Sequence, residues 1–189
     1  MCDVPFAHGK TPPVHAGLGR REFIRIATIG GGAAIVAGIS ANGAMAGGKA
    51  KALMLSCMDY RLVDDLVTMM VTMGMQDNYD HVVLAGASLG VVNDKFAGWH
   101  DTFWQHLDVA KQLHGIEEVI VIDHRDCGAY RLALGEAAVS TPEAELQMHT
   151  LAINEFARRV AARHPELKVE GWLMALDGTA EHIEIAAAA

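Results

Sequence analysis

From residue 47 onward, short apolar runs rich in branched side chains alternate with longer stretches of helical periodicity. Alternation of this kind is typical of a parallel β-sheet covered by helices. We therefore predict an α/β fold, in which a single domain has a central, mainly parallel sheet of order about 2-1-3-4 flanked by helices. The predicted strands are 51–56, 81–85, 118–123 and 168–176.

Three intervening segments carry apolar residues at the spacing of one helix face. The first predicted helix has a stripe of four such residues, the second a stripe of five, and the third begins at Thr141-Pro142, where a proline suits the first turn. We expect these stripes to be buried: Val63, Leu66, Val67 and Met70; Phe96, Trp99, Phe103, Leu107 and Ala110; Leu146, Ile153, Phe156 and Val160. His149 falls on the third stripe and is interpreted as a core histidine with a satisfied hydrogen bond.

A Gly- and Ala-rich stretch without charged residues lies near the N-terminus. It follows the pair Arg20-Arg21 and ends in Ala44-Met45-Ala46, a small-x-small sequence typical of signal cleavage sites. This segment resembles a twin-arginine export signal.

That resemblance implies a signal peptide at residues 1–46, cleaved after about Ala46, and a mature domain at 47–189. It implies a periplasmic or exported protein whose partner during export is the twin-arginine export machinery. The alternative is an uncleaved membrane anchor, because the uncharged run from Ile26 to Gly48 approaches the roughly 20 residues that a spanning helix needs.

The composition and net charge of the chain indicate which kinds of ligand it can bind. The chain of 189 residues has 23 acidic and 15 basic residues, a formal charge of -8, and 51% of its residues are hydrophobic. A chain of this size and composition can build one domain with a core. The acidic balance argues against binding to nucleic acid or to an anionic membrane surface, so we expect a small-molecule ligand.

Two short motifs carry the candidate chemistry. Cys57, Asp59 and Arg61 come directly after the first predicted strand, and His124 and Cys127 follow the third. Ligands of open α/β sheets bind beyond the carboxyl ends of the strands, near the point where the strand order reverses. If the order is 2-1-3-4, the first and third strands are neighbours and the two motifs face each other.

Two thiolates and one imidazole suit Zn²⁺, and a catalytic zinc keeps its fourth position open. Cys57, His124 and Cys127 are therefore the predicted metal ligands. Asp59 can serve as the fourth ligand, or a bidentate ion pair with Arg61 can hold its carboxylate off the metal and leave room for water. Arg125 and Asp126, inside the second motif, are interpreted as a solvated loop pair.

The motifs C-x-D-x-R and H-x-x-C-G, present here as Cys57-Met58-Asp59-Tyr60-Arg61 and His124-Arg125-Asp126-Cys127-Gly128, resemble those of the β-class carbonic anhydrases. The resemblance implies zinc on Cys57, His124 and Cys127, with Asp59 and Arg61 as a catalytic dyad. It implies reversible hydration of carbon dioxide to bicarbonate by zinc-bound hydroxide, and a homo-oligomer. Relatives that hydrolyse carbonyl sulfide or carbon disulfide leave that activity as an alternative.

Three further alternatives stay open. The first is a non-catalytic zinc protein in which Asp59 permanently closes the metal shell, and the second is a disulfide between Cys57 and Cys127. The third is a serine hydrolase, because "GASLG" (86–90) matches G-x-S-x-G with Ser88 as the nucleophile. Its candidate partners are Asp123 or Asp177 with His149, His164 or His182.

Overall fold

The computed structural model describes residues 48–186, which form one α/β unit around a five-stranded sheet of order β2-β1-β3-β4-β5. The first four strands in this order pair in parallel, and β5 is antiparallel to β4. The predicted fold class and strand order are confirmed, with β5 added at the edge. The strands are β1 (Ala52–Ser56), β2 (Tyr79–Val83), β3 (Glu118–His124), β4 (Lys168–Met174) and β5 (Ala180–Ile183).

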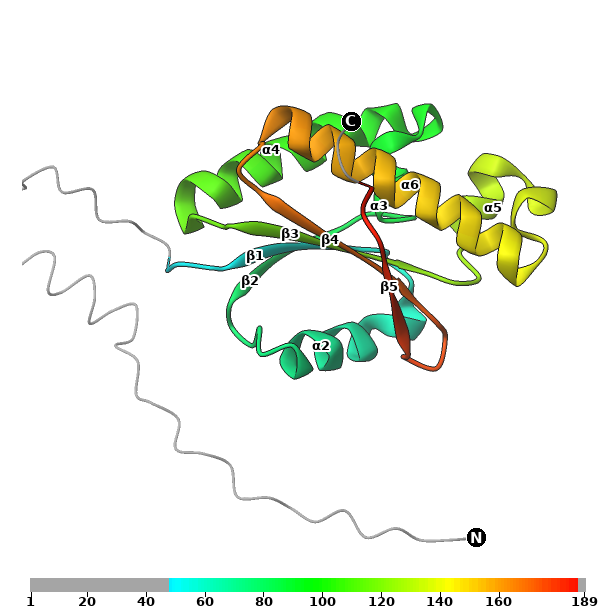
Figure 1. The fold of residues 1–189 in the computed structure, drawn as a ribbon, viewed down its shortest axis with the longest axis horizontal. Coiled ribbons are helices and arrows are strands. Elements are labelled where there is room, and N and C mark those ends of the chain that lie inside the picture. The colour runs from blue at the N-terminus through cyan, green and yellow to red at the C-terminus, as the bar shows by residue number, and fades with distance from the viewer. Residues whose placement is uncertain (1–47, 187–189) are drawn as a thin grey trace, which may run out of the picture. The chain divides into compact units, whose positions relative to one another are not determined.

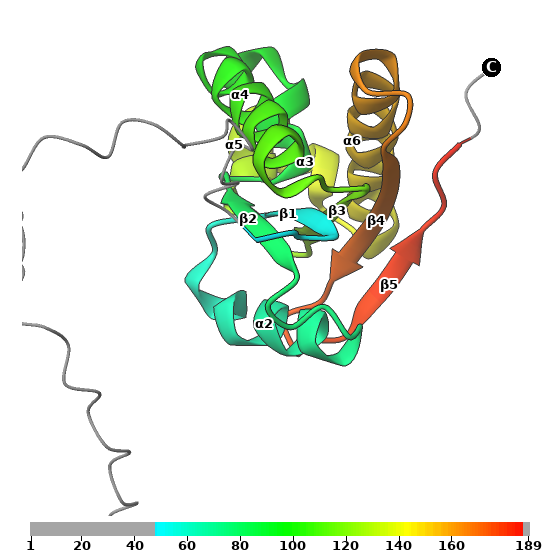
Figure 2. The ribbon, with the colours of Figure 1, turned by 90° about the vertical axis from the view of Figure 1, so that its left-hand side faces the viewer.

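Helices cover both faces of the sheet (Figures 1 and 2). The helix α2 (Val63–Thr72) lies on one face, and four helices lie on the other: α3 (Ser88–Val92), α4 (Ala97–His114), α5 (Gly128–Leu134) and α6 (Pro142–Arg163). Short 3-10 turns precede or follow them: η1 (Tyr60–Leu62), η2 (Asp94–Phe96) and η3 (Glu136–Val139). The predicted start of α6 is confirmed, because the Thr141 side chain caps it by accepting a 3.2 Å hydrogen bond from the Ala144 N–H.

The signal peptide proposed for residues 1–46 and its cleavage after about Ala46 lie outside the described residues. Within residues 48–186, no helix is long and apolar enough to cross a membrane.

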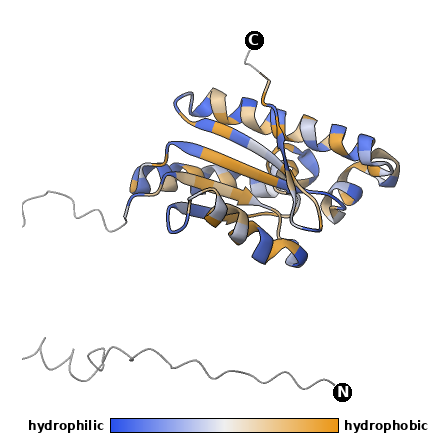
Figure 3. Ribbon diagram, turned by 60° about the horizontal axis from the view of Figure 1, so that its bottom comes forward, coloured by the Kyte–Doolittle hydropathy of each residue, from blue (hydrophilic) through white to orange (hydrophobic). Residues whose placement is uncertain are grey.

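The core lies on both sides of β1 and β3, whose residues are all buried. Successive side chains of a strand point to opposite faces. Leu53 and Leu55 therefore pack under the four-helix layer, while Met54 and Ile120 pack against α2. Figure 3 shows hydrophobic residues along the middle of the sheet; they include the apolar runs 52–55 of β1 and 119–122 of β3, as burial on both faces requires.

The buried stripe predicted for α2 is only half correct. Leu66 and Met70 are buried, but Val63 and Val67 are 53% and 48% exposed. The reason is that, among residues 48–186, α2 is the one helix on its face of the sheet, so no second helix of this part flanks it and only a narrow strip of α2 contacts the sheet. Trp99, predicted to be buried, is 37% exposed and stacks on Phe96 with ring centroids 4.5 Å apart.

The last predicted strand, 168–176, is found two residues shorter than predicted. β4 ends at Met174, and beyond the predicted strand Asp177 and Gly178 reverse the chain into β5, with Gly178 at a φ of 82°. The Asp177 carboxylate accepts a 3.0 Å hydrogen bond from the Thr179 N–H and stabilises the turn. The strand β5 after this turn was not predicted.

Candidate metal centre

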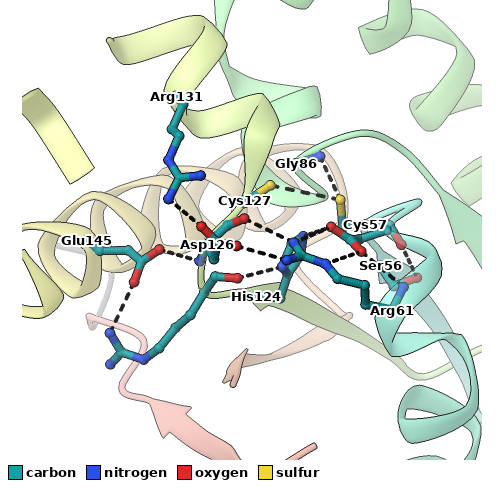
Figure 4. A network of polar contacts seen from close by, with 11 residues as sticks. Ser56, Cys57, Arg61, Gly86, His124, Asp126, Cys127, Arg131 and Glu145 are labelled. Carbon is teal, nitrogen blue, oxygen red and sulfur yellow. Dashed lines mark hydrogen bonds and ion pairs between the residues drawn. The ribbon is translucent and has the colours of Figure 1, made fainter. Parts of the chain in front are cut away.

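The three predicted metal ligands converge at the carboxyl edge of the sheet (Figure 4). Cys57 follows β1, His124 ends the neighbouring β3, and Cys127 immediately precedes α5. One ligand atom from each residue lies within 4.8 Å of the other two. The pairing of β1 with β3 thus brings the two motifs together, as the strand order predicted.

The geometry of this cluster fits a tetrahedral metal ion. The two sulfur atoms are 3.9 Å apart, close to the ~3.8 Å that separates two thiolates each about 2.3 Å from zinc, and Cys57 and Cys127 are both free. The His124 Nδ1 donates to the Arg125 carbonyl at 2.8 Å, which leaves Nε2 as the atom with a lone pair. That Nε2 is buried and has no hydrogen-bond partner among the described residues, as expected of a metal ligand.

The surroundings favour a thiolate at Cys57. A hydrogen bond from the Cys127 thiol, the neighbouring His124 ring and the Gly86 N–H, 3.2 Å from the sulfur, lower the pKa of Cys57, although burial opposes the change. The same thiol contact and burial raise the pKa of Cys127. Burial disfavours a charged His124 ring, but the contacts with Cys57, the Arg125 carbonyl and Asp59 together outweigh burial and raise the pKa of His124. One anionic sulfur is therefore available to attract a cation.

Asp59 lies beside the three ligands and is held by Arg61. The Arg61 Nε and Nη2 donate to the two carboxylate oxygens at 2.9 and 2.7 Å, and the Arg61 backbone N–H donates to Asp59 Oδ1 at 3.0 Å. Asp59 Oδ2 is 3.8 Å from His124 Nε2. The hydrogen bonds from Arg61 lower the pKa of Asp59 to about 2, so the carboxylate is ionised and both its oxygens are oriented.

Asp126 has a role that the interpretation as a solvated loop pair missed. Its carboxylate accepts a 2.8 Å hydrogen bond from Arg61 Nη1 and forms an ion pair with Arg131. Its backbone carbonyl accepts a 3.2 Å hydrogen bond from Arg61 Nη2. Its N–H donates to Glu145 at 2.5 Å, and its φ is 58°. Asp126 therefore fixes the guanidinium that fixes Asp59, and nothing in the spacing of the motif indicated this contact.

A small cavity adjoins Asp59 and His124 on the α2 side of the sheet. Its volume is about 10 Å³, the room that one water molecule needs. Its walls are mostly apolar side chains, with the Asp59 carboxylate and the His124 ring as its polar part; Cys57 and Asp123, at the ends of the strands, also border it. The apolar lining residues are Leu62, Leu66, Ile122 and Met174.

Ser88 does not have the setting of a catalytic nucleophile, which corrects the serine hydrolase alternative. It begins α3 as the G-x-S-x-G match implies, but its side chain is fully buried and its hydroxyl donates to Asp123 at 2.7 Å. His149 bonds the same carboxylate at 2.9 Å, so the acid lies between serine and imidazole. A catalytic triad needs the imidazole beside the hydroxyl, in order to take its proton. His149 is buried and its Nδ1 is bonded, as predicted for a core histidine, but its Nε2 has no hydrogen-bond partner among the described residues.

Comparison with known proteins gives a family match. A family model described as "Putative carbonic anhydrase" matches residues 47–184. An uncharacterized protein of Rickettsia conorii is 38% identical over 135 residues, which are 71% of this chain and 73% of that protein. An uncharacterized protein of Rickettsia bellii is 39% identical over 135 residues, covering 71% of this chain and 82% of the other.

Two solved structures share the fold. The chain matches a tetrameric β-carbonic anhydrase of the ascomycete Sordaria macrospora with a TM-score of 0.50 and 14% identity, over 75% of this chain and 84% of that one. It matches the β-carbonic anhydrase CafA of Aspergillus fumigatus with a TM-score of 0.51 and 17% identity, over 75% and 79% of the two chains.

The ion pair between Asp59 and Arg61 makes a prediction about pH. In Arg61→Met, the pKa of Asp59 should rise from about 2 toward the ordinary value of about 3.9, as followed by carboxyl ¹³C NMR. Because the pKa is lower in the folded state, the stabilisation by this pair should be complete above a pH of about 4. It should be lost as the pH falls through about 2. Arg131→Met, which removes ion pairs to Asp126 and Glu136 but none to Asp59, is the control and should leave the pKa of Asp59 low. An unchanged Asp59 titration in Arg61→Met would contradict the assignment.

Proposed function

This chain belongs to the carbonic anhydrase family whose model it matches, and from that premise we propose that it catalyses the reversible hydration of carbon dioxide to bicarbonate. In this proposal Cys57, His124 and Cys127 hold one Zn²⁺. The observation that carries the proposal is the convergence of three ligand atoms within 4.8 Å, one of them a buried imidazole nitrogen without a partner among the described residues. A buried polar atom of this kind is costly unless something binds it.

Zinc, when bound, lowers the pKa of a water molecule to about 7 and so supplies a nucleophile near neutral pH. The part of Asp59 is to accept a hydrogen bond from the attacking water and to aim its lone pair at the substrate carbon. Two features suit it to this role: a pKa of about 2, which keeps it an acceptor, and the bidentate grip of Arg61, which fixes both oxygens. With both oxygens held, Asp59 stays beside the metal position and the fourth ligand site is left to water.

The apolar cavity beside Asp59 suits a small uncharged substrate. Carbon dioxide has no net charge and needs no buried counter-charge. The cavity of about 10 Å³ has room for one water molecule, so a substrate of three heavy atoms would enter it with a small movement of Leu62 or Leu66. Bicarbonate is an anion with three oxygens that hydrogen-bond to water, so it is held less well by these walls and leaves.

The first experiment is elemental analysis of protein purified without added metal, with carbon dioxide hydration followed by stopped flow on the same sample. About one zinc per chain with fast hydration supports the proposal. Zinc without hydration overturns the reaction but keeps the site, and directs the assay to carbonyl sulfide, to carbon disulfide and then to a non-catalytic zinc role. Absence of zinc, with a disulfide between Cys57 and Cys127, overturns both.

The role of Asp59 predicts a specific mutant phenotype. Asp59→Asn should lower the turnover number for hydration by roughly 10²–10⁴-fold, because the amide presents only one acceptor oxygen and no charge to the attacking water. Zinc content should stay near one per chain. Asp101→Asn, the same change at an exposed position on α4, is the matched control. Equal turnover in both variants would refute the role of Asp59.

We also propose that the protein is a homo-oligomer in which α2 contacts a second copy. Val63, Val67 and Val71 recur every four residues along α2 and are 53%, 48% and 47% exposed, and Tyr60, just before them, is 84% exposed. A row of exposed apolar side chains is typical of a surface that a partner covers. The Sordaria macrospora enzymes that share this fold are tetrameric, which supports an oligomer here.

This assignment predicts that Val67→Glu lowers the molar mass in solution, measured by light scattering after size exclusion, because a charge would be buried in the contact. Leu151→Glu, on the exposed side of α6 and 58% exposed, should leave the mass unchanged. If Val67→Glu keeps the mass of the unmodified protein, α2 is not the contact surface.

We propose further that residues 1–46 direct export and are removed. The support is the sequence alone: the Arg20-Arg21 pair, the weakly apolar stretch and Ala44-Met45-Ala46. Replacing Arg20-Arg21 by Lys-Lys should retain the protein in the cytoplasm of a bacterial host, as shown by cell fractionation, whereas Arg25→Lys should not. N-terminal sequencing of the exported form should begin near Gly47. An exported form that still carries its N-terminus would contradict cleavage.

A further inference from the structure

Behind the candidate metal centre, one buried carboxylate receives four hydrogen bonds. Asp123 Oδ1 accepts from the Ser88 N–H at 3.0 Å. Its Oδ2 accepts from the Ser88 hydroxyl at 2.7 Å, the Tyr130 hydroxyl at 2.5 Å and His149 Nδ1 at 2.9 Å. All four residues are buried, with exposures of 0% or 1%. A buried carboxylate lowers the stability of the fold unless such donors surround it. If packing were its only role, an apolar residue would fill the position equally well.

Strand alternation puts the hydrogen bonds of this cluster on the face of the sheet opposite α2. Asp123 and His124 are adjacent at the end of β3, so their side chains point to opposite faces of the sheet. His124 lines the cavity with Leu62 and Leu66, next to α2. Asp123 bonds side chains of α3, α5 and α6 on the other face. Fixing one of these neighbours therefore fixes the other.

Two of the three donor residues to Asp123 lie in segments that form part of the metal centre. Tyr130 lies in the first turn of α5, three residues after Cys127. Ser88 lies two residues after Gly86, whose N–H donates to the Cys57 sulfur at 3.2 Å. Asp123 itself precedes His124. The carboxylate thus joins the segments that carry His124 and Cys127 to the turn that contacts Cys57.

The turn before Ser88 shows that these bonds act on the backbone. Ala87 is fully buried and has a φ of 40° and a ψ of -104°, a conformation that residues with a side chain rarely adopt. Gly86 has a φ of 77°, and a Cβ there would lie 3.1 Å from the Ala129 Cβ, so the turn presses closely on α5. Strained backbone persists where surrounding contacts hold it, and the two bonds from Ser88 to Asp123 are such contacts.

We propose that Asp123 is a positioning residue which, with Ser88, Tyr130 and His149 as donors, presets the segments that carry Cys57, His124 and Cys127 for metal binding. This inference rests on the proposed function, because it takes the three residues to be metal ligands. Because the cluster already holds these segments in place, they need to move little when the metal binds. The cluster thereby affects metal affinity and ligand geometry without contacting the metal.

The test measures zinc affinity by competition with a chromophoric chelator. Tyr130→Phe removes one hydroxyl, and Asp123→Asn removes the charge; each should weaken zinc binding by about 10–100-fold. Tyr79→Phe on β2 is the matched control for the loss of a hydroxyl. Val160→Ala, a core truncation on α6, is the control for loss of stability. Both controls should keep the affinity of the unmodified protein.

Absorption spectra of the Co²⁺-loaded proteins report ligand geometry separately from folding. At full loading, the bands of Tyr130→Phe should change in position or intensity, and those of Val160→Ala should not. Unchanged affinity and spectrum in Tyr130→Phe would overturn the inference, as would an equal loss of affinity in Val160→Ala. If the unmodified protein binds neither metal, the proposed function fails together with the inference, and that result is distinct from the other two.

Discussion

The parallel pairing of β1 with β3 is the constraint on which the rest of the site depends. It places Ser56 opposite Ile122, so the residues that follow Ser56 meet the end of β3 at one edge of the sheet. Cys57 and Cys127 are 70 positions apart in the chain, and only this pairing brings their sulfur atoms together. Both strands are buried on both faces, and displacement of either would expose apolar surface on two sides at once. The metal centre therefore lies at the ends of two strands whose residues are all buried.

Arg61 connects the two motifs at this edge by ion pairs to one carboxylate in each. It bonds Asp59 in its own motif and Asp126 in the other, so the two motifs are joined by ion pairs as well as by the strands. The guanidinium is shared between two carboxylates, and this raises the pKa of Arg61 and lowers the pKa values of Asp59 and Asp126. The Asp59 carboxylate is consequently ionised and oriented before any substrate arrives, which is what orientation of a water molecule requires.

At the end of β3, the two faces of the sheet carry different parts of the site. On one face, His124 lines a small, mostly apolar cavity beneath α2. On the other, Asp123 gathers hydrogen bonds from three helices. The proposed chemistry and the proposed positioning are thus separated by the thickness of one strand, and each can be tested without altering the other directly.

The sequence by itself determined the α/β class, the order of the first four strands, the start of α6 at Thr141 and the pairing of two motifs into one site. These features rest on local periodicity, capping chemistry and the rule that parallel strands end at a common edge. Only the tertiary structure decided which side chains of α2 are buried, because that depends on how many helices share a face of the sheet. It also decided that Asp126 holds Arg61 and that Ser88, Tyr130 and His149 meet at Asp123. Those contacts join residues far apart in the chain, and no spacing in the sequence records the distance between them.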